Sequence, residues 1–509
     1  MTESVTAAAE DYSQQREFLG HPVGLYVCFT TELWERFSFY GMKYLLLLYL
    51  TKYHLFTDEM GLDVLGSYAG LGYALPLIGG MIADRFLGMR KAVLFGGVSL
   101  SLGHILMAVE GYQAKFYAAG TMLTENLALA SGEVIAAGTV LVEDITMRDT
   151  AALNVFYFAL ALIVMGVGYL KPNISTIVGK LYSQEDPRRD SGFTIFYMGI
   201  NIGSFTATLL CGWLGETYGW SYGFGAAGIG MIIGLITFTM GQKYLHGHAE
   251  PTEPEKLKKK FLGPINVEWS IYLLSIPVLG VLWLLVQHEP IVLITQNVFL
   301  IVSIVSLILY SMVHTKKDHN NTLAYSIAAV AILSGIFAVI ANLHPVAGIE
   351  AFAEQALYLS IILIVGFVIY GFLTHYSEEF GRTVVLMILI LSTIVFWALF
   401  EQSAGSMTLY ADRVVDRTLG NTTFTAAQFG SLNAGFIMLL AIPFAALWTW
   451  LAKKNLEPNT PVKFGLGILQ AGLGFGALVF GAQHPNEAGQ VAMIWLVLAY
   501  LLHTTGELC

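Results

Sequence analysis

The stretch Glu32-Leu-Trp-Glu35-Arg36-Phe-Ser-Phe-Tyr40-Gly-Met-Lys43 decides how the chain is interpreted. It lies inside an apolar run over residues 23–50, long enough to cross a bilayer as a helix. At 100° per residue, the four ionisable side chains share one face of that helix, with Tyr40 at its edge. Charges inside a membrane span are costly and must face protein or water. The stripe therefore indicates a substrate and proton pathway or, alternatively, a structural ion network between helices.

Composition places the chain among membrane proteins. Of 509 residues, 56% are hydrophobic and 12% are charged, and the mean hydropathy is +0.65. The apolar runs are continuous and about 20 residues long, which predicts an all-α polytopic membrane protein rather than a β-barrel. Cys28, Cys211 and Cys509 are scattered and predict neither a disulfide framework nor a metal site. We expect no cleavable signal peptide, because residues 1–20 are polar and the first apolar run is a full span.

The apolar runs predict fourteen membrane spans, in three groups. The first six cover residues 23–50, 62–83, 91–111, 154–176, 191–214 and 222–243. The next four cover 268–286, 291–313, 322–342 and 353–374, and the last four cover 383–405, 430–452, 464–482 and 490–509.

The positive charges of the loops set the expected orientation. With a cytoplasmic N-terminus, most loops rich in Lys and Arg fall inside, in agreement with the positive-inside rule. Five residues break the bias: Lys52, Lys115, Arg148, Arg413 and Arg417. The resulting division is a cytoplasmic tail (1–22), an N-terminal six-helix bundle (23–243) with a periplasmic insertion (112–153), a linker with about four extra helices (244–382), and a partial C-terminal bundle (383–509).

A glycine-rich loop motif follows the second span: Gly79-Gly-Met-Ile-Ala-Asp84-Arg85-Phe-Leu-Gly88-Met-Arg90. Glycines allow two helices to approach closely and to turn tightly. We expect Asp84 either to cap the next helix or to pair with Arg90. The pattern resembles the cytoplasmic loop motif of the major facilitator superfamily, and it is a structural signal.

Later spans carry isolated polar groups. Lys171 and Pro172 lie within the fourth span, where the lysine is either functional or snorkelling to the interface. Tyr197 and Asn201 share one helix face in the fifth span, as ligand contacts or as interhelical hydrogen bonds. Single carboxyl groups follow in apolar runs at Glu401 and Glu507, and such groups mark proton or substrate pathways.

In this order, the motifs resemble one family closely. They are Glu32-x-x-Glu35-Arg36-Phe-x-Phe-Tyr40-Gly, Leu-Lys171-Pro172-Asn, Phe-Tyr197-x-x-Ile-Asn201-x-Gly, Glu401-Gln, Ser-Leu-Asn433 and Gly-Glu507-Leu. They are similar to the proton-dependent oligopeptide transporters of the major facilitator superfamily. The resemblance implies uptake of di- and tripeptides with protons by alternating access, in the inner membrane, with no other cofactor, no enzymatic activity and no nucleic acid partner.

The resemblance also implies roles for single residues. Glu32, Glu35, Arg36 and Glu401 are expected to couple protons, with Lys171 linked to the first glutamates. Lys43 and Lys171 are expected to receive the carboxylate of the peptide. Glu507, with Asn433, is the expected opposite pole for its amino group. The pocket walls are expected to include Tyr40, Tyr73, Tyr197, Asn201 and Trp397.

The chain departs from the family in several places. Lys43 stands where arginine is common, and Phe39 stands where tyrosine is usual. The insertion at 112–153 and a second extra hairpin are also unusual. Family members continue beyond Glu507, so we expect the C-terminal bundle to be truncated inside its fourth helix, and residues 1–509 alone not to transport.

Other functions remain open. One is transport of another small substrate, such as nitrate or an amino acid, on the same fold. A second is a peptide sensor that does not transport. A membrane-embedded enzyme is the least favoured, because His21, His54, His104 and His503 are isolated and no nucleophile–base pair is found.

Overall fold

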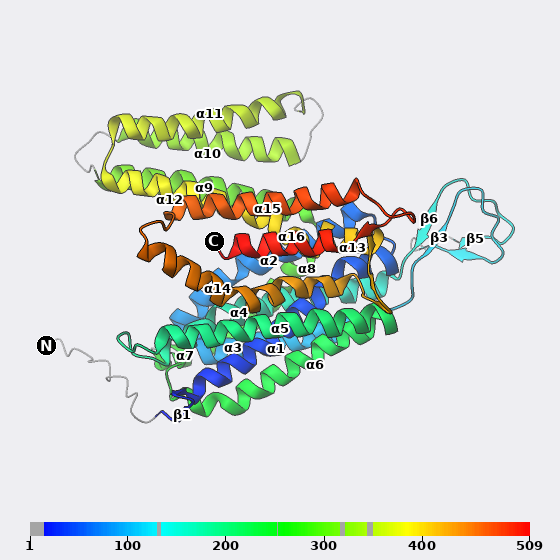
Figure 1. Ribbon diagram of the computed structural model, residues 1–509, viewed down its shortest axis with the longest axis horizontal. Coiled ribbons are helices and arrows are strands. Elements are labelled where there is room, and N and C mark those ends of the chain that lie inside the picture. The colour runs from blue at the N-terminus through cyan, green and yellow to red at the C-terminus, as the bar shows by residue number, and fades with distance from the viewer. Residues whose placement is uncertain (1–14, 130–133, 252, 316–320, 344–349) are drawn as a thin grey trace.

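The computed structural model describes residues 15–129, 134–251, 253–315, 321–343 and 350–509 and consists mainly of long helices (Figure 1). Eleven helices in this described part are long and apolar enough to cross a membrane, so the protein is a multi-pass membrane protein. α1 is not among the eleven and differs from them in carrying Glu32, Glu35, Arg36 and Lys43. Each of the fourteen predicted spans overlaps one long helix, and the predicted all-α membrane fold is confirmed.

The first six long helices pack around one another. They are α1 (Val23–Leu48, continued by a π-helical turn, Tyr49–Tyr53), α2 (Asp58–Ile82), α3 (Met89–Met107), α4 (Thr150–Lys180), α5 (Arg189–Tyr218) and α6 (Trp220–Gly241). A short helix, α7 (Pro254–Lys258), follows. Four long helices come next: α8 (Val267–Val286), α9 (Glu289–Thr315), α10 (Thr322–Leu343) and α11 (Glu350–Thr374).

The remaining helices are α12 (Glu378–Phe400), α13 (Ser406–Arg413), α14 (Ser431–Lys453), α15 (Thr460–Ala482) and α16 (Ile494–Glu507). A 3-10 turn, Glu401–Ala404, joins α12 to α13. Outside the insertion, the described strands are two or three residues long: β1 (Glu17–Phe18), β2 (His21–Pro22), β7 (Lys260–Leu262), β8 (Ile265–Asn266), β9 (Val415–Asp416), β10 (Thr418–Leu419), β11 (Thr422–Thr423) and β12 (Val491–Ala492). The division of the chain at residues 243 and 382 stays a prediction.

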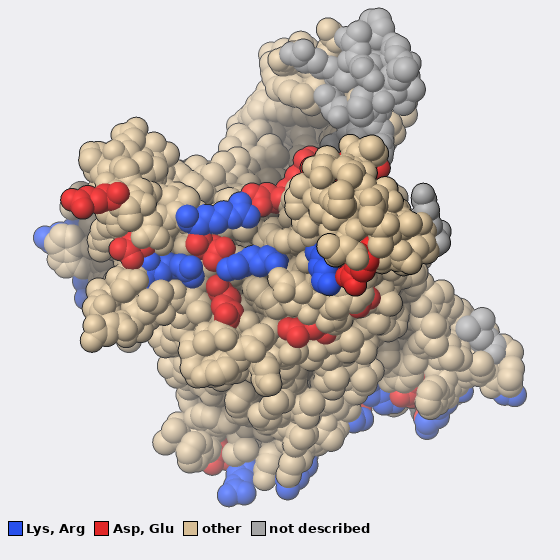
Figure 2. Space-filling model, turned by 90° about the vertical axis from the view of Figure 1, so that its right-hand side faces the viewer, with Lys and Arg blue, Asp and Glu red and all other residues tan. Residues whose placement is uncertain are grey.

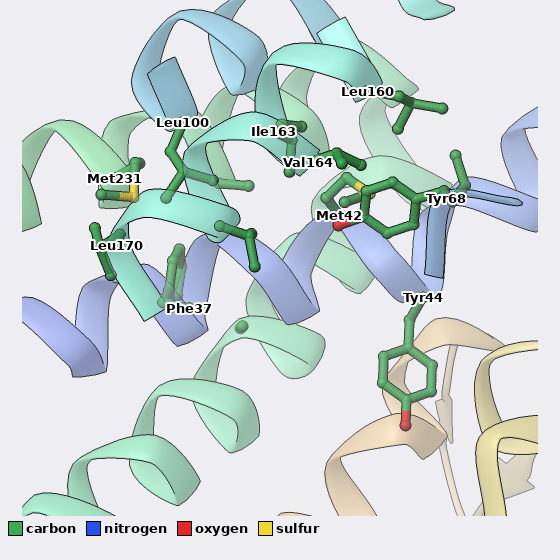
Figure 3. Close-up of a cluster of buried hydrophobic side chains, with 14 of the residues drawn as sticks. Phe37, Met42, Tyr44, Tyr68, Leu100, Leu160, Ile163, Val164, Leu170 and Met231 are labelled. Carbon is green, nitrogen blue, oxygen red and sulfur yellow. The ribbon is translucent and has the colours of Figure 1, made fainter. Parts of the chain in front are cut away.

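Close approach of glycines sets the packing of α2 on α4. A Cβ atom built at Gly79 would lie 2.0 Å from the carbonyl oxygen of Gly168, so no larger residue fits there. Large apolar side chains from α1, α3, α4 and α6 fill the core of this bundle (Figure 3), among them Phe37, Leu100, Ile163 and Met231. Tyr44 points away from this cluster toward the ribbon of later residues (Figure 3), so α1 contacts both halves of the molecule.

The loop motif after α2 is only partly as expected. Gly79 and Gly88 have the roles expected of glycine: Gly88 begins α3 with φ +75°. Both roles expected for Asp84 are wrong, because the N-cap of α3 is Gly88 and Arg90 instead pairs with Glu250 and donates to Gln242 (2.8 Å). Asp84 and Arg85 are exposed. The motif therefore ties the α2–α3 turn to the segment after α6, a pairing that has no local signal in the sequence.

The insertion between α3 and α4 forms strands, which the sequence did not predict. β3 (Lys115–Tyr117) pairs with β6 (Ile145–Met147), and β4 (Leu127–Ala128) pairs with β5 (Val134–Ile135), so that the segment protrudes from one end of the molecule (Figure 1). We call this the insertion end. Residues 118–129 and 136–147 repeat one pattern, beginning Ala-Ala-Gly-Thr. They bond reciprocally, with Gly120 N donating to Leu141 O and Gly138 N to Leu123 O, each at 2.8 Å.

The extra helices attach in two ways. α8 packs on the first bundle, where the hydroxyls of Tyr169 and Ser275 lie 3.2 Å apart and Phe95 packs against Tyr272. α10 and α11 pair with each other at the edge of the molecule (Figure 1) and share a second apolar core with α9 and α12.

Candidate functional site

The charged stripe of α1 folds into a buried cluster within one helix. Arg36 forms a two-bond ion pair with Glu35, in which Nε bonds Oε2 and Nη2 donates to Oε1 at 2.8 Å. The same Nε lies 3.2 Å from Glu32 Oε1. The three side chains are at most 5% exposed. Among the described residues, the second oxygen of Glu32 has no hydrogen-bond partner. One cation thus serves two carboxylates, and one carboxylate oxygen has capacity for a proton.

Gly203 explains how α5 covers this cluster. A Cβ atom at Gly203 would lie 2.2 Å from Leu33 O and 3.2 Å from Arg36 Cβ. The two helices therefore touch at the level of the cluster, and α5 excludes lipid from it. A low-dielectric surrounding strengthens the ion pairs and makes an unpaired charge costly.

A second ion pair crosses between the two halves of the molecule. Lys43 on α1 pairs with Glu401 in the turn after α12, and Tyr73 on α2 donates a hydrogen bond to the other oxygen of Glu401 at 3.0 Å. Nearby, Tyr44 donates to the hydroxyl of Ser403 at 3.2 Å. The direct pair of Lys43 with Glu401 was not predicted, and the role of Glu507 as the opposite pole for a bound peptide stays a prediction. A residue pair 358 positions apart leaves no local trace in the sequence.

Lys171 lies beside this pair without joining it. Its ammonium is 4.9 Å from the centre of the Tyr73 ring, a cation–π contact. No carboxylate in the described part of the chain is within 4 Å of it, so the expected ion pair with Glu32 or Glu35 is not formed. Pro172 follows within α4, and the Gly168 carbonyl that it leaves without a helical donor faces Gly79.

Glu507 lies at the end of α16 beside Asn433 of α14, as expected. The Asn433 amide donates to Glu507 Oε2 and to the Thr504 hydroxyl, both at 3.1 Å. Trp397 and Glu507 line a cavity of about 170 Å³ together with Phe396, Lys463 and Gly506. This half of the molecule thus presents a carboxylate and an indole on one cavity wall.

The remaining expected residues lie between these groups. Tyr40 is half-buried, packs edge-on against Phe39 at 5.2 Å, and is within electrostatic range of Glu401 and Glu507. Tyr197 is exposed and within electrostatic range of Glu507. The Asn201 amide donates to the Tyr197 carbonyl at 3.0 Å, inside its own helix.

The insertion end carries ion pairs that join the two halves. Lys52 pairs with Asp412 at 2.8 Å, and Nη1 and Nη2 of Arg413 each donate to a carboxylate oxygen of Asp58 at 2.7 Å. Arg417 lies 3.6 Å from Asp412 and 3.9 Å from Glu216. Figure 2 shows acidic and basic side chains alternating across the centre of this face. We call these pairs the outer latch.

No function was predicted for the residues of the outer latch, although the positions of its cations were unusual. Lys52, Arg413 and Arg417 are three of the five cations that broke the charge bias of the loops. Each has a carboxylate partner across the halves, which for Arg417 is Glu216. A fourth, Arg148, instead donates to the carbonyls of His54 and Leu55 at 2.7 and 2.8 Å. Cations at unexpected positions therefore indicated specific pairing.

The opposite end of the molecule is built differently. There the described ion pairs join neighbours within one half or join the first bundle to the linker, as in Arg90–Glu250, Lys91–Glu268 and Arg188–Asp186. None in the described ranges links the first bundle to α12–α16. α14 runs beside α5 near the insertion end and diverges from it toward this end (Figure 1). Among the described residues, ion pairs thus join the first bundle to α12–α16 or the loops between them at the insertion end and not at the opposite end.

Comparison with known proteins gives concordant results. The family model described as "POT family" matches residues 90–262 and 297–509. "Peptide transporter YePEPT" of Yersinia enterocolitica is 33% identical over 509 residues, covering 97% of this chain and 81% of that protein. "Uncharacterized transporter YclF" of Bacillus subtilis is 32% identical with the same coverage. A crystal structure of "peptide transporter POT in complex with sulfate" has a TM-score of 0.64 at 30% identity, covering 98% of this chain and 84% of that one.

Proposed function

This chain belongs to the POT family, and from that membership we propose that it is a symporter that takes up di- and tripeptides together with protons. YePEPT, a third identical over nearly the whole chain, is named a peptide transporter. The transported ion is the proton, and the protein needs no cofactor and catalyses no covalent reaction. The charged groups in the middle of the molecule support this assignment.

The observation that carries the proposal is the placement of opposite charges across the two halves. Lys43 and Lys171 lie on the first bundle, whereas Glu401 and Glu507 lie on the second. A peptide at neutral pH is a zwitterion, so its carboxylate is attracted to the lysines and its ammonium to Glu507. Tyr40, Tyr73 and Trp397 add aromatic walls, which tolerate varied side chains.

Substrate and protons act on the same ion pair in this proposal. The carboxylate of a bound peptide competes with Glu401 for Lys43, and a proton on Glu401 also releases Lys43. Either event removes the central bond between the halves and shifts their equilibrium, as alternating access requires. In the α1 cluster, the proton is taken by Glu32 at the oxygen that has no partner.

The orientation that we propose places the N-terminus in the cytoplasm and the insertion in the periplasm, across the inner membrane. The lysine-rich loops then lie inside, in agreement with the positive-inside rule. With this orientation the outer latch closes the periplasmic side, and the binding groups face the cytoplasm.

Binding of dialanine tests the proposal. We expect the purified protein to bind dialanine saturably, and to bind the C-terminal amide and the N-acetyl derivative at least tenfold more weakly. Lys171→Ala is expected to reduce, but not to abolish, the penalty for the amide, and Glu507→Gln is expected to reduce the penalty for acetylation. Lys115→Gln, an exposed lysine of the insertion, is the matched control and keeps both. Equal binding of free and capped peptides would contradict the proposal.

Uptake tests the coupling. In cells that express the protein from its own gene, accumulation of labelled dialanine is expected to rise with an inward proton gradient and to collapse with a protonophore. Accumulation that is unaffected by the protonophore would contradict proton coupling.

A further inference from the structure

A second basic pocket lies between the cytoplasmic ends of α4 and α5. It has a volume of about 450 Å³, and its polar lining comes from Ser175, Thr176, Lys180, Gln184 and Arg189. None of these residues belongs to the peptide site described above. The pocket holds two cations and therefore selects an anion.

The two cations of the pocket have no acidic partner. No described carboxylate lies within 4 Å of Lys180 or Arg189, and the Nε of Arg189 is buried without a hydrogen-bond partner. The adjacent Arg188 differs, since it bonds Asp186, Glu17 and the Gly20 carbonyl and thereby lowers the pKa of the Asp186 carboxyl. An arginine that only sets the membrane orientation of the chain can keep all its nitrogens in water. A buried Arg189 nitrogen without a partner instead indicates that Arg189 binds a ligand.

Arg189 and Phe193 lie beside Gly179 of α4. A Cβ atom at Gly179 would lie 3.5 Å from Arg189 Nη2 and 3.4 Å from Phe193 Cζ. The guanidinium and the ring therefore lie against the backbone of α4. This arrangement gives the pocket a planar cation next to an apolar surface, which suits a carboxylate attached to a small side chain.

The pocket lies on the same faces of α4 and α5 as Lys171 and Tyr197. On α4, the residues not buried from Lys171 onward are Lys171, Pro172, Ser175, Thr176, Gly179 and Lys180, which form one unbroken stripe. On α5, Tyr197, Phe193 and Arg189 follow each other at intervals of four, which is one helix face. Lys180 follows Lys171 by nine residues on α4, which corresponds to a helical rise of about 14 Å. Lys180 thus lies further toward the cytoplasm than Lys171 by about this distance.

We propose that Lys180 and Arg189 form an exit subsite, which receives the carboxylate of a peptide after Lys171 has released it. The inference rests on the proposed function, since it names the peptide as the anion. A dipeptide is about 7 Å long when extended and has a single carboxylate, so that carboxylate occupies one of the two sites at a time and moves from one to the other. When the affinity of Lys171 for the peptide carboxylate falls, Lys180 and Arg189 attract that carboxylate toward the cytoplasm.

Protection of a thiol introduced in the pocket tests the subsite. Gln184→Cys places a thiol in the lining, and Cys509→Ser removes the only native cysteine that is not buried. The protein is held in nanodiscs of phosphatidylcholine and alkylated with an uncharged maleimide. In the Lys171→Ala background, dialanine is expected to slow alkylation about fivefold, and dialanine amide is expected to have no effect.

Two variants of one helix end provide the contrast. Lys180→Gln with Arg189→Gln is expected to abolish protection, whereas Arg188→Gln, which removes a charge already neutralised by Asp186, is expected to retain it. Thermal unfolding of each variant shows that it is folded. Protection that survives the double substitution, or that disappears with Lys171→Ala alone, would overturn the subsite.

A lipid phosphate is the competing anion. If phosphatidylglycerol in the nanodiscs slows alkylation by itself and dialanine adds nothing in phosphatidylcholine, the pocket binds lipid and the proposal fails. If the unsubstituted protein binds dialanine through Lys171, but dialanine gives no protection of the thiol in the Lys171→Ala background, only the exit subsite is overturned. Absence of any dialanine binding by the unsubstituted protein would overturn the proposed function and the subsite together.

Discussion

The α1 cluster and the Lys43–Glu401 pair have the same chemistry but different positions. The cluster of Glu32, Glu35 and Arg36 lies within one helix and is almost completely buried. Its ion pairs therefore do not depend on how the two halves are placed relative to each other. Lys43 and Glu401 lie on different halves, and the Glu401 side chain is 28% exposed. In the proposed mechanism, the cluster stores a proton, whereas the crossing pair responds to a proton or a carboxylate by releasing a bond between the halves.

The largest expected effect comes from the cluster. Arg36→Gln leaves two buried carboxylates without their cation, and breaking a buried pair in this way costs about 3–5 kcal/mol. We expect a large drop in the thermal unfolding temperature of the purified protein. Arg382→Gln is the matched control, because Arg382 and Glu378 form an i, i+4 pair that is more than three-quarters exposed and contributes little. Equal unfolding temperatures for the two variants would show that the buried ion pairs of the cluster do not stabilise the fold more than an exposed pair does.

Substitutions of the two members of the crossing pair, Lys43 and Glu401, are expected to change the affinity for dialanine in opposite directions. Glu401→Gln removes the competitor for Lys43, so dialanine is expected to bind about tenfold more tightly, or about 1.4 kcal/mol. Lys43→Gln removes a group that receives the carboxylate and is expected to weaken binding by a similar factor. Isothermal titration at neutral pH measures both. If both substitutions weaken binding, the pair is purely structural.

Much of this comparison could be predicted from the sequence. The cluster is local, since Glu32, Glu35 and Arg36 lie within five residues of one another and helical periodicity alone places them together. The crossing pair could not be predicted, because 358 positions separate its members and only the packing of the two halves joins them. For the same reason the Arg90–Glu250 pair was missed.

Other parts show which physical signals carry far. Apolar runs identified the long helices, because a span must satisfy its own backbone hydrogen bonds. The insertion was missed as β-structure, because its strands are two or three residues long and are held by reciprocal bonds between two repeats. The cations Lys52, Arg413 and Arg417 were seen as exceptions, and only the structure identified their partners.

The outer latch is expected to show a smaller effect than the crossing pair. Arg413 and Asp58 are each about half exposed, and such pairs contribute about 0.2–1 kcal/mol. Arg413→Gln is therefore expected to increase amide hydrogen exchange in α13 up to fivefold. High salt is expected to produce a similar increase in the unsubstituted protein. Lys115→Gln at the same end is the control, and an equal increase there would contradict a specific role for the latch.

The smallest effect concerns the base of the insertion. His54 is buried beside Arg148 and Asp149, and burial lowers its pKa to about 4. The ordinary pKa of a histidine is 6.5. Between pH 6.5 and pH 4, His54 therefore takes up a proton when the insertion is detached but not when it is attached. The attachment of the insertion weakens as the pH falls. The Ala114 amide, which donates to Tyr53 O at 2.9 Å, reports this attachment.

Hydrogen exchange measures the change at the insertion. The protection factor of the Ala114 amide, corrected for intrinsic exchange, is expected to fall severalfold between pH 7 and pH 4, and His54→Gln is expected to remove most of this dependence. An unchanged pH dependence in that variant would assign the titration to another group.

The most direct test of the crossing pair is a distance measured across the insertion end. Spin labels at Glu59→Cys on α2 and Leu419→Cys on β10 lie on exposed positions of the two halves. The account predicts a single short distance at neutral pH, a longer population in Glu401→Gln or with acid, and no such change in Glu32→Gln. A distance that lengthens with Glu32→Gln but stays short with Glu401→Gln would contradict the claim that Lys43–Glu401 holds the halves together.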